Sequence, residues 1–496
     1  MKQILYIFPK ERLFNMNIVM VSSEVLPISK TGGLADVVYS LSKEYVKLGH
    51  KVSIITPLYK NGNLSCFKNV KQVMSFKTIM NWREISTSVQ HSLYKGIDYY
   101  FIDAKQYFER DGFYGYYDDG ERFALFANAT IEILKRLPYK VDILNVHDWQ
   151  AAMIPCLLKV KYFDNKSLNK IKTVLTIHNP LFKGYLNKDS LFDLYNLGLD
   201  IYYNGKVRLE EQVSTLKAGI VYSDKITTVS PTHKEELLTY EGGKGLNYDL
   251  SLRENDFAGF LNGMDYDEFN PRKDKAIFKN YSLKTLNEGK FKNKVEICKV
   301  FNLNPKLPLF AVVSRLTDQK GVDLILAMAD FISHEGGNFA LIGSGERWAE
   351  DNLRELKNKN PNNVYIYFGY NEELAHKLYS AADFFIMPSA FEPCGLGQMI
   401  AQRYGTIPVI RQTGGLKDSV ICLSEDNKNY KVANGIGFER YNVIDSLKAS
   451  AKALIIYSSK NNIFNRLRIN AFKTNHSWAN SAKLYLGLYE ELLTNN

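Results

Sequence analysis

The sequence predicts an α/β protein in which two doubly wound parallel sheets, one in each half of the chain, form separate domains. Three observations favour this fold class. Short apolar runs alternate with longer amphipathic stretches throughout the chain. This pattern breaks near residues 262–285, where Asn, Gly, Asp, Pro and Lys replace the apolar periodicity. The chain has 496 residues, which is enough for two sizeable cores.

The apolar runs of the two halves are read as buried strands. In the first half they are NIVMVSS (17–23), KVSIITP (51–57), ILNVHD (143–148), KTVLTIHN (172–179) and KITTVS (225–230). In the second half they are PLFAVVSRL (308–316), FALIGSG (339–345), NVYIYFG (363–369), FFIMPS (384–389) and TIPVIRQ (406–412). Parallel strands need crossover connections, so helices are expected between them, and two separate sheets fit better than one very wide sheet.

Composition excludes several classes of function. Lys and Arg number 63 against 53 acidic residues, a net charge of +10, but the positive charges are dispersed, which argues against a nucleic-acid surface. Five scattered cysteines without a CxxC pair argue against a disulfide framework or a zinc site and favour a reducing cytoplasm. We find no membrane-length apolar run, we expect no signal peptide because charges follow the short run ILYIF at once, and the start of translation at Met1 or Met16 stays open.

Two similar turns stand almost four hundred residues apart, KTGGLAD (30–36) and QTGGLKD (412–418). Each follows an apolar strand and opens an amphipathic helix. Glycines there let a ligand approach the backbone, and free amides at a helix start favour an anion. Lys30 and Arg411 would add positive charge. The alternative is that the paired glycines only allow tight turns and close helix packing.

Seven segments together resemble the landmarks of bacterial glycogen synthases and plant starch synthases. In order they are KTGGLADV, HDWQ (147–150), KAGIVYSDKITTVSPT (217–232), LNGMD (261–265), SRLTDQKG (314–321), FEPCGL (391–396) and QTGGLKD. The resemblance runs from about residue 16 to the C-terminus. It implies the GT-B architecture, two Rossmann-like domains that face each other across a cleft.

The resemblance also implies a division of the chain. We expect a dispensable extension at 1–15 and an N-terminal Rossmann-like domain at 16–265 on the acceptor side. A C-terminal Rossmann-like domain at 266–476 would bind the nucleotide-sugar donor, and a C-terminal helix at 477–496 would cross back onto the first domain.

The predicted site combines strand-end residues with roles that the family implies. Arg315 and Lys320 follow an apolar strand and would neutralise the departing diphosphate without a metal. In the family the equivalent of His147 lies beneath the transferred glucose, and that of Glu392 holds the sugar hydroxyls. Both are expected to border the site so openly that replacing them leaves the melting temperature nearly unchanged. His178 is not assigned a catalytic role, because PLFKG follows it where the family usually has AYQG.

The candidate residues fall into three groups. The predicted catalytic residues are His147, Asn262, Arg315, Lys320 and Glu392. The predicted donor-binding residues are Lys30, Gly32, Gly33, Asp36, Tyr370, Cys394, Gly395, Leu396, Thr413, Gly414 and Gly415, with Tyr370 placed to stack on the donor base. The candidate acceptor residues are Tyr114, Tyr116 and Tyr117, whereas Phe123 and Phe126 read as part of a buried helix.

No metal and no cofactor is predicted. The DYD tripeptide at 265–267 spells the DxD pattern of metal-dependent glycosyltransferases, but it lies at the inferred domain join and is interpreted as linker. Gly397 stands where the family often has Thr or Ser, so one donor contact is expected to be missing.

The resemblance implies an ADP-glucose-dependent α-1,4-glucan synthase of glycogen biosynthesis that retains the anomeric configuration. The expected partners are ADP-glucose and an α-1,4-glucan, with no nucleic acid and no membrane. Two alternatives stay open, a GT-B enzyme that uses a UDP-sugar and a noncatalytic glucan-binding paralogue.

Overall fold

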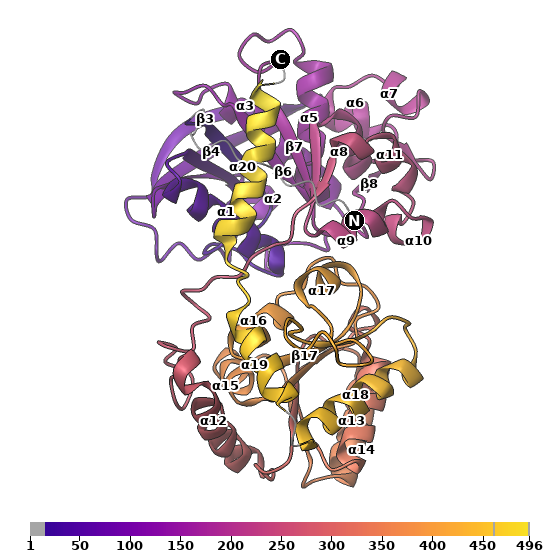
Figure 1. Ribbon diagram of the computed structural model, residues 1–496. Coiled ribbons are helices and arrows are strands. Elements are labelled where there is room, and N and C mark those ends of the chain that lie inside the picture. Colours follow the sequence, from indigo (N-terminus) through magenta and orange to yellow (C-terminus); the bar gives the residue numbers. More distant parts are fainter. Residues whose placement is uncertain (1–14, 460–461, 495–496) are drawn as a thin grey trace. The chain divides into compact units, whose positions relative to one another are not determined.

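The computed structural model describes residues 15–459 and 462–494, which form two compact units, each with its own sheet (Figure 1). Unit 1 comprises the described chain up to Val229, then Lys234–Asn262 and the described chain from Trp478 on. Unit 2 comprises Ser230–His233 and Gly263–Ser477. The predicted α/β class with two doubly wound sheets is confirmed. Residues 1–14 of the predicted extension lie outside the described residues.

Unit 1 is built on a nine-stranded sheet. Across the sheet lie β12 (Phe257–Gly259), β11 (Lys225–Thr228), β7 (Lys172–Ile177), β6 (Ile143–His147), β1 (Asn17–Val21), β2 (Lys51–Pro57), β5 (Ile97–Asp103), β4 (Arg83–Tyr94) and β3 (Lys71–Met80). All pairs are parallel except those that involve β4. The five strands predicted in this half are all present, whereas β3, β4, β5 and β12 were not predicted.

Both faces of this sheet are covered, which explains its continuous apolar strands. In β1, Val19 and Val21 pack into one core cluster and Ile18 and Met20 into the other. Because successive side chains of a strand point to opposite faces, a strand buried on both sides is apolar at every position. Helix α20 (Trp478–Thr494) lies beside α1 (Gly33–Lys47) over one face (Figure 1).

The other helices of unit 1 are mostly short. They are α2 (Lys105–Phe108), α3 (Asp119–Leu134), α4 (Asp148–Ala151), α5 (Met153–Cys156), α6 (Ser190–Tyr195), α7 (Asp200–Tyr203), α8 (Thr215–Tyr222), α10 (Tyr240–Gly243) and α11 (Asn247–Leu252), and α9 (Pro231–Leu237) spans the unit boundary. A small antiparallel sheet contains β8 (Tyr185–Leu186), β10 (Gln212–Ser214) and β9 (Arg208–Leu209). Phe123 and Phe126 of α3 are buried, as predicted.

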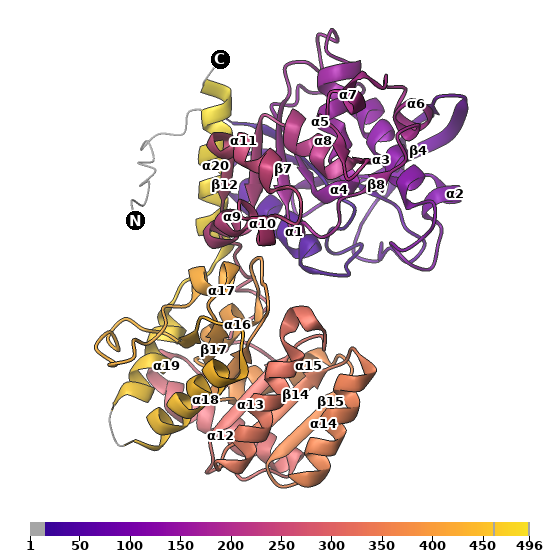
Figure 2. The ribbon, with the colours of Figure 1, turned by 90° about the vertical axis from the view of Figure 1, so that its right-hand side faces the viewer.

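Unit 2 is built on a six-stranded parallel sheet. Across it lie β15 (Val364–Phe368), β14 (Asn338–Gly343), β13 (Leu309–Val313), β16 (Phe384–Met387), β17 (Ile407–Arg411) and β18 (Ile436–Phe438), of which only β18 was not predicted. Its helices are α12 (Leu286–Phe301), α13 (Val322–His334), α14 (Arg347–Lys359), α15 (Glu372–Ala381), α16 (Gly397–Arg403), α17 (Gly414–Ser419), α18 (Val443–Ser458) and α19 (Ile463–Lys473). Helices α13 and α18 lie side by side on the sheet (Figure 2).

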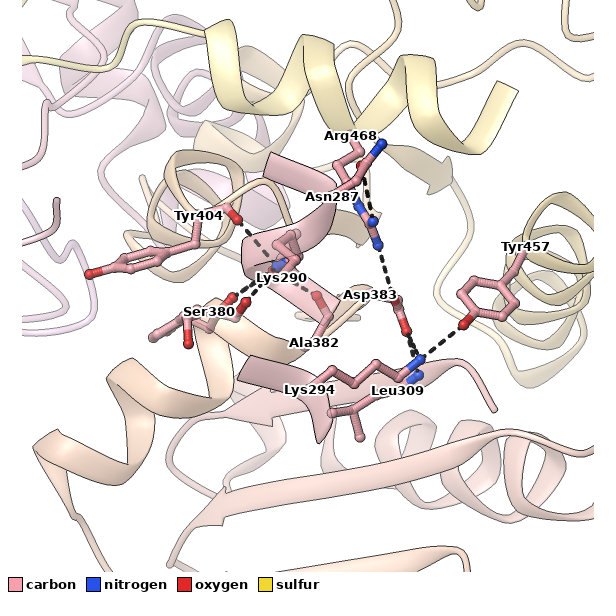
Figure 3. Close-up of polar contacts among 12 residues, drawn as sticks. Asn287, Lys290, Lys294, Leu309, Ser380, Ala382, Asp383, Tyr404, Tyr457 and Arg468 are labelled. Atoms are coloured by element: carbon pink, nitrogen blue, oxygen red, sulfur yellow. Dashed lines mark hydrogen bonds and ion pairs between the residues drawn. The ribbon is translucent and has the colours of Figure 1, made fainter. Parts of the chain in front are cut away.

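A buried polar network fixes the two central strands of unit 2 at their amino ends (Figure 3). Asp383, directly before β16, accepts hydrogen bonds from Lys294 Nζ at 2.6 Å, from the Leu309 amide at 2.9 Å and from Arg468 at 2.7 Å. Burial alone would raise the pKa of Asp383, but the two cations hold it below its usual range. The network therefore ties α12, α19, β13 and β16 together, and the opposite ends of β13 and β16 carry the predicted site.

Beside it, Nζ of Lys290 donates to the carbonyl oxygens of Ser380 and Tyr404, both at 3.1 Å (Figure 3). It also donates to the Thr406 hydroxyl at 2.7 Å. Burial lowers the pKa of Lys290 well below its ordinary value.

No helix in the described part of the chain is long and apolar enough to cross a membrane.

Candidate functional site

In unit 1 the predicted residues lie where parallel strands end. The chain runs from β1 to β2 on one side, whereas β6 pairs with β1 on the other. Such a reversal of strand order opens a crevice at the carboxyl ends of the strands. The loop after β1 carries Lys30 and Gly32, and α1 begins at Gly33. Strand β6 ends at His147, and Asn262 follows β12. Strand-end position, which sequence alone could indicate, is thus confirmed.

His147 is buried, and its relative exposure is 0%. Its Nδ1 lies 3.0 Å from Nε2 of His178, the residue after β7. Burial and the neighbouring imidazole lower the pKa of His147 well below its ordinary value, and burial lowers the pKa of His178 to about 3. Both rings are therefore neutral at physiological pH, and one donates a hydrogen bond to the other. The expectation that His147 stands openly at the site was wrong.

Two of the predicted residues at this edge each have a buried side-chain atom without a hydrogen-bond partner among the described residues, Nε2 in His147 and Oδ1 in Asn262. Buried polar atoms are almost always paired in folded proteins, so such atoms call for a ligand or for water. A ring nitrogen and an amide oxygen suit the hydroxyl groups of a sugar. Predicted site residues of unit 1 therefore have unused hydrogen-bonding capacity.

Asp148, which the sequence analysis did not select, organises the turn that follows β7. Its Oδ1 accepts hydrogen bonds from the backbone amides of His178 at 2.7 Å and Asn179 at 3.3 Å. Asp148 has a φ of 53°, and burial raises its pKa to about 7. The pattern HD at the end of a buried strand was the available signal for this residue.

Glu24 is a second residue that sequence reasoning missed, and it fixes the first TGGL turn. It is buried and accepts hydrogen bonds from the Thr31 amide, from the Thr31 hydroxyl at 2.6 Å and from the Tyr114 hydroxyl at 2.7 Å. Lys30 is paired with Asp36 at 2.9 Å, so two predicted donor ligands contact each other here. An acid three residues beyond β1 was the signal that could have revealed Glu24.

The three candidate acceptor tyrosines differ in environment. The hydroxyl of Tyr114 also contacts Ser23 at 2.8 Å, which makes this side chain part of the wall around Glu24. Tyr116 accepts a hydrogen bond from the Gly112 amide at 2.8 Å and packs under the Arg122 guanidinium. Tyr117 is 99% exposed. Only Tyr117 presents a whole aromatic face to solvent, as stacking on a sugar requires.

In unit 2 the strand order reverses between β13 and β16, and the predicted catalytic residues lie on the two loops that follow these strands. Lys320 Nζ contacts Glu392 Oε2 at 2.5 Å, and the Ser389 hydroxyl donates to the same oxygen at 3.2 Å. The Lys320 and Glu392 side chains are 18% and 7% exposed. The structure thus brings two of the predicted catalytic residues together, but Glu392 is not the open carboxylate that we expected.

The two TGGL turns serve different purposes. A Cβ atom added at Gly415 would lie 2.3 Å from the carbonyl oxygen of Cys394, so only glycine allows this turn to pack on the loop that carries Glu392. The Gly415 amide donates to the Glu392 carbonyl at 3.0 Å. A Cβ atom added at Gly32 or at Gly33 would have no atom within 4 Å. Close packing therefore explains a glycine of the second turn, whereas the first has room for a ligand.

Further predicted residues surround this edge of unit 2. Arg411 does not point into open space; it donates to the carbonyls of Ala390 at 2.6 Å and Glu439 at 3.1 Å, which ties the Glu392 loop to β17. Arg315 is exposed after β13, and Tyr370, after β15, is 76% exposed. The other predicted donor ligands lie on the loops after β16 and β17 and at the start of α17; they are Cys394, Gly395, Leu396, Thr413 and Gly414.

Comparisons with known proteins cover both units. Residues 17–252 match the family described as starch synthase catalytic domain, and residues 293–468 match glycosyl transferases group 1. A glycogen synthase of Clostridium kluyveri is 41% identical over 96% of this chain and 100% of its own length. A glycogen synthase of Lactococcus lactis is 39% identical over the same shares of the two chains.

A solved structure adds the fold. The catalytic domain of starch synthase IV from Arabidopsis thaliana, bound to ADP and acarbose, superposes with a TM-score of 0.89 at 32% identity. The superposition covers 97% of this chain and 100% of the plant chain.

Proposed function

The chain belongs to the family of glycogen and starch synthases and is a hexosyltransferase of the GT-B fold, and we propose that it transfers glucose from ADP-glucose to the nonreducing end of an α-1,4-glucan. The observation that carries the proposal is the Lys320 and Glu392 pair at the strand reversal of unit 2, 2.5 Å apart. A cation at this position can stabilise the negative charge that grows on a departing diphosphate, and the carboxylate beside it can bind hydroxyls of the sugar.

In the proposed reaction the bond between the anomeric carbon and the diphosphate oxygen breaks, and the acceptor hydroxyl forms the new bond on the same face. The acceptor proton leaves with ADP. Arg315 and Lys320 stabilise the negative charge that grows on the diphosphate, so no metal is required for this step. The exposed ring of Tyr370 stacks on the base.

In this proposal Glu392 binds the hydroxyls of the transferred sugar and does not attack its anomeric carbon. In the structure its Oε2 is already engaged by Lys320 and Ser389, which orients the carboxylate and leaves Oε1 for the hydroxyls of the sugar. A carboxylate that is held by two donors is a poor nucleophile, which favours transfer on one face over a covalent glucosyl intermediate.

In unit 1, we propose that the unpartnered Oδ1 of Asn262 accepts a hydrogen bond from a glucose hydroxyl, and that the unpartnered Nε2 of His147 forms a hydrogen bond with another. The depressed pKa of His147 keeps its ring neutral, and a neutral ring does not oppose the positive charge that develops at the anomeric carbon. Lys30 stays a predicted ligand of the nucleotide sugar, and Tyr117 stays a predicted contact of the glucan acceptor.

The presence of ADP in the plant starch synthase structure supports an adenine nucleotide as donor here. The test is incorporation of labelled glucose into glycogen from ADP-glucose and from UDP-glucose side by side. We expect ADP-glucose to give the higher kcat/KM. A preference for UDP-glucose would favour the alternative donor, and no incorporation from either donor would favour a noncatalytic glucan-binding protein.

A further inference from the structure

One group of side chains in unit 2 has the composition and spacing of a metal site and includes no residue of the proposed transfer. Glu268, Glu372 and His376 each offer one ligand atom, and these atoms lie within 4.8 Å of one another. Across residues 15–459 and 462–494, it is the one group of three or more His, Cys, Asp or Glu side chains gathered in this way.

The fold explains why the three meet. Glu372 and His376 stand four residues apart in α15, so their side chains lie on one face of the helix. Glu268 comes from the segment that enters unit 2 after Gly263. The next residue, Phe269, stacks on the His376 ring, with 4.9 Å between ring centroids and 20° between the ring planes. The stacking holds this segment against α15.

A carboxylate behind His376 sets the ring for metal binding. His376 is buried, and its Nδ1 lies 2.8 Å from Oδ2 of Asp274, which also accepts a hydrogen bond from the Tyr404 hydroxyl. An ionised Asp274 can only accept, so Nδ1 carries the hydrogen and the lone pair of the neutral ring is on Nε2. Metal-binding histidines almost always have such a carboxylate or carbonyl on the second nitrogen.

We propose that Glu268, Glu372 and His376 bind a divalent transition-metal ion, with Zn²⁺ as the best fit. One imidazole and two carboxylates leave a fourth position for water in a tetrahedral zinc site, whereas Mg²⁺ and Ca²⁺ prefer oxygen ligands alone. Zinc ligands about 2.1 Å from the ion lie about 3.4 Å from each other, and the two exposed glutamates can close the remaining distance.

The proposal revises an expectation from the sequence and leaves the proposed reaction unchanged. Five scattered cysteines argued against zinc, but this site uses none of them, nor the DYD tripeptide. The ion would link the segment around Glu268 to the first turn of α15, two residues after Tyr370. We therefore expect metal binding to stabilise unit 2 without being needed for glucose transfer.

The test measures Zn²⁺ affinity of the untagged full chain, freed of metal with EDTA and desalted, by competition with a fluorescent zinc chelator. We expect one equivalent to bind to the wild type, and Glu268→Gln and Glu372→Gln each to weaken binding at least about tenfold. Glu373→Gln is the matched control. It removes a neighbouring exposed carboxylate of α15 that pairs with Lys377 at 2.5 Å, so binding should not change.

Both test variants alter exposed side chains, so folding is preserved, and circular dichroism checks this. The absorption spectrum of the Co²⁺-loaded chain identifies the donor atoms. A spectrum without thiolate charge transfer agrees with the proposed nitrogen and oxygen ligands. Failure to bind one equivalent, binding by both variants as tight as in the wild type, or a thiolate band that assigns the ion to a cysteine would each overturn the proposal.

Discussion

The contact between Lys320 and Glu392 predicts that replacing the lysine lowers the free energy of unfolding more than replacing the glutamate. Lys320→Met leaves the Glu392 carboxylate, 7% exposed, with the Ser389 hydroxyl in place of a cation. Breaking a buried ion pair from one side costs about 3 to 5 kcal/mol, and the 18% exposure of the Lys320 side chain places this pair at the lower end, about 3 kcal/mol.

Glu392→Gln has a smaller effect on stability, because the amide can still accept from Ser389 and the lysine stem lets the ammonium reach water. We expect a loss of about 1 kcal/mol. In the double variant no charge is left unpaired, so the combined loss should fall about 2 kcal/mol short of the sum. All three variants should lose glucose transfer.

Differential scanning calorimetry provides the assay. For a unit of this size, 1 kcal/mol corresponds to about 2 to 4 °C, so Lys320→Met should lower the Tm by about 6 to 12 °C. Lys292→Met is the control, since it removes one partner of an exposed pair with Glu288 in α12 and should leave the Tm unchanged. A larger drop for Glu392→Gln than for Lys320→Met, or strictly additive losses, would refute this reasoning.

The remaining predictions concern the glycine turns, the histidine pair and metal dependence. Gly415→Ala should lower both Tm and activity, because its Cβ would meet the Cys394 carbonyl, whereas Gly32→Ala should keep the wild-type Tm; equal thermal shifts would contradict this. The pKa of His178 is about 3 in the fold and about 6.5 when unfolded, so the unfolded chain binds more protons between these values and stability falls as pH drops through that range. His178→Gln should make the fall of Tm with pH shallower, and an unchanged slope would show that this ring is protonated in the fold. Glucose transfer should persist in EDTA, and loss of activity that Mg²⁺ restores would show that a metal acts in the reaction.

The sequence was most informative about elements buried on both faces. Runs such as the one at 51–57 became strands because a strand covered on both sides is apolar at every position. The antiparallel strands β3 and β4 were missed, although two signals were available. Apolar and polar residues alternate along both strands, and the turn that joins β4 to β5 consists of Lys95 and Gly96, both with positive φ. They are the last two strands at one edge of the sheet, where one face is exposed to solvent and apolar residues are therefore fewer.

Strand ends could be predicted, but not which side chains meet there. Lys320 and Glu392 were assigned separate roles from position and resemblance, yet they form one partly buried ion pair across 72 residues of sequence. Likewise, the sequence could not show that Arg411 binds carbonyl groups or that His147 pairs with His178. Such pairings depend on register and rotamers across neighbouring loops, which hydrophobic periodicity does not record.

The most direct measurement of the central claim is nuclear magnetic resonance of the product made from a maltohexaose acceptor and ADP-glucose labelled with carbon-13 at the anomeric carbon. The account predicts that the label appears in a single new α-1,4-linked residue at the nonreducing end in the first round of transfer. A β-linked product, or label found only in free glucose, would contradict it.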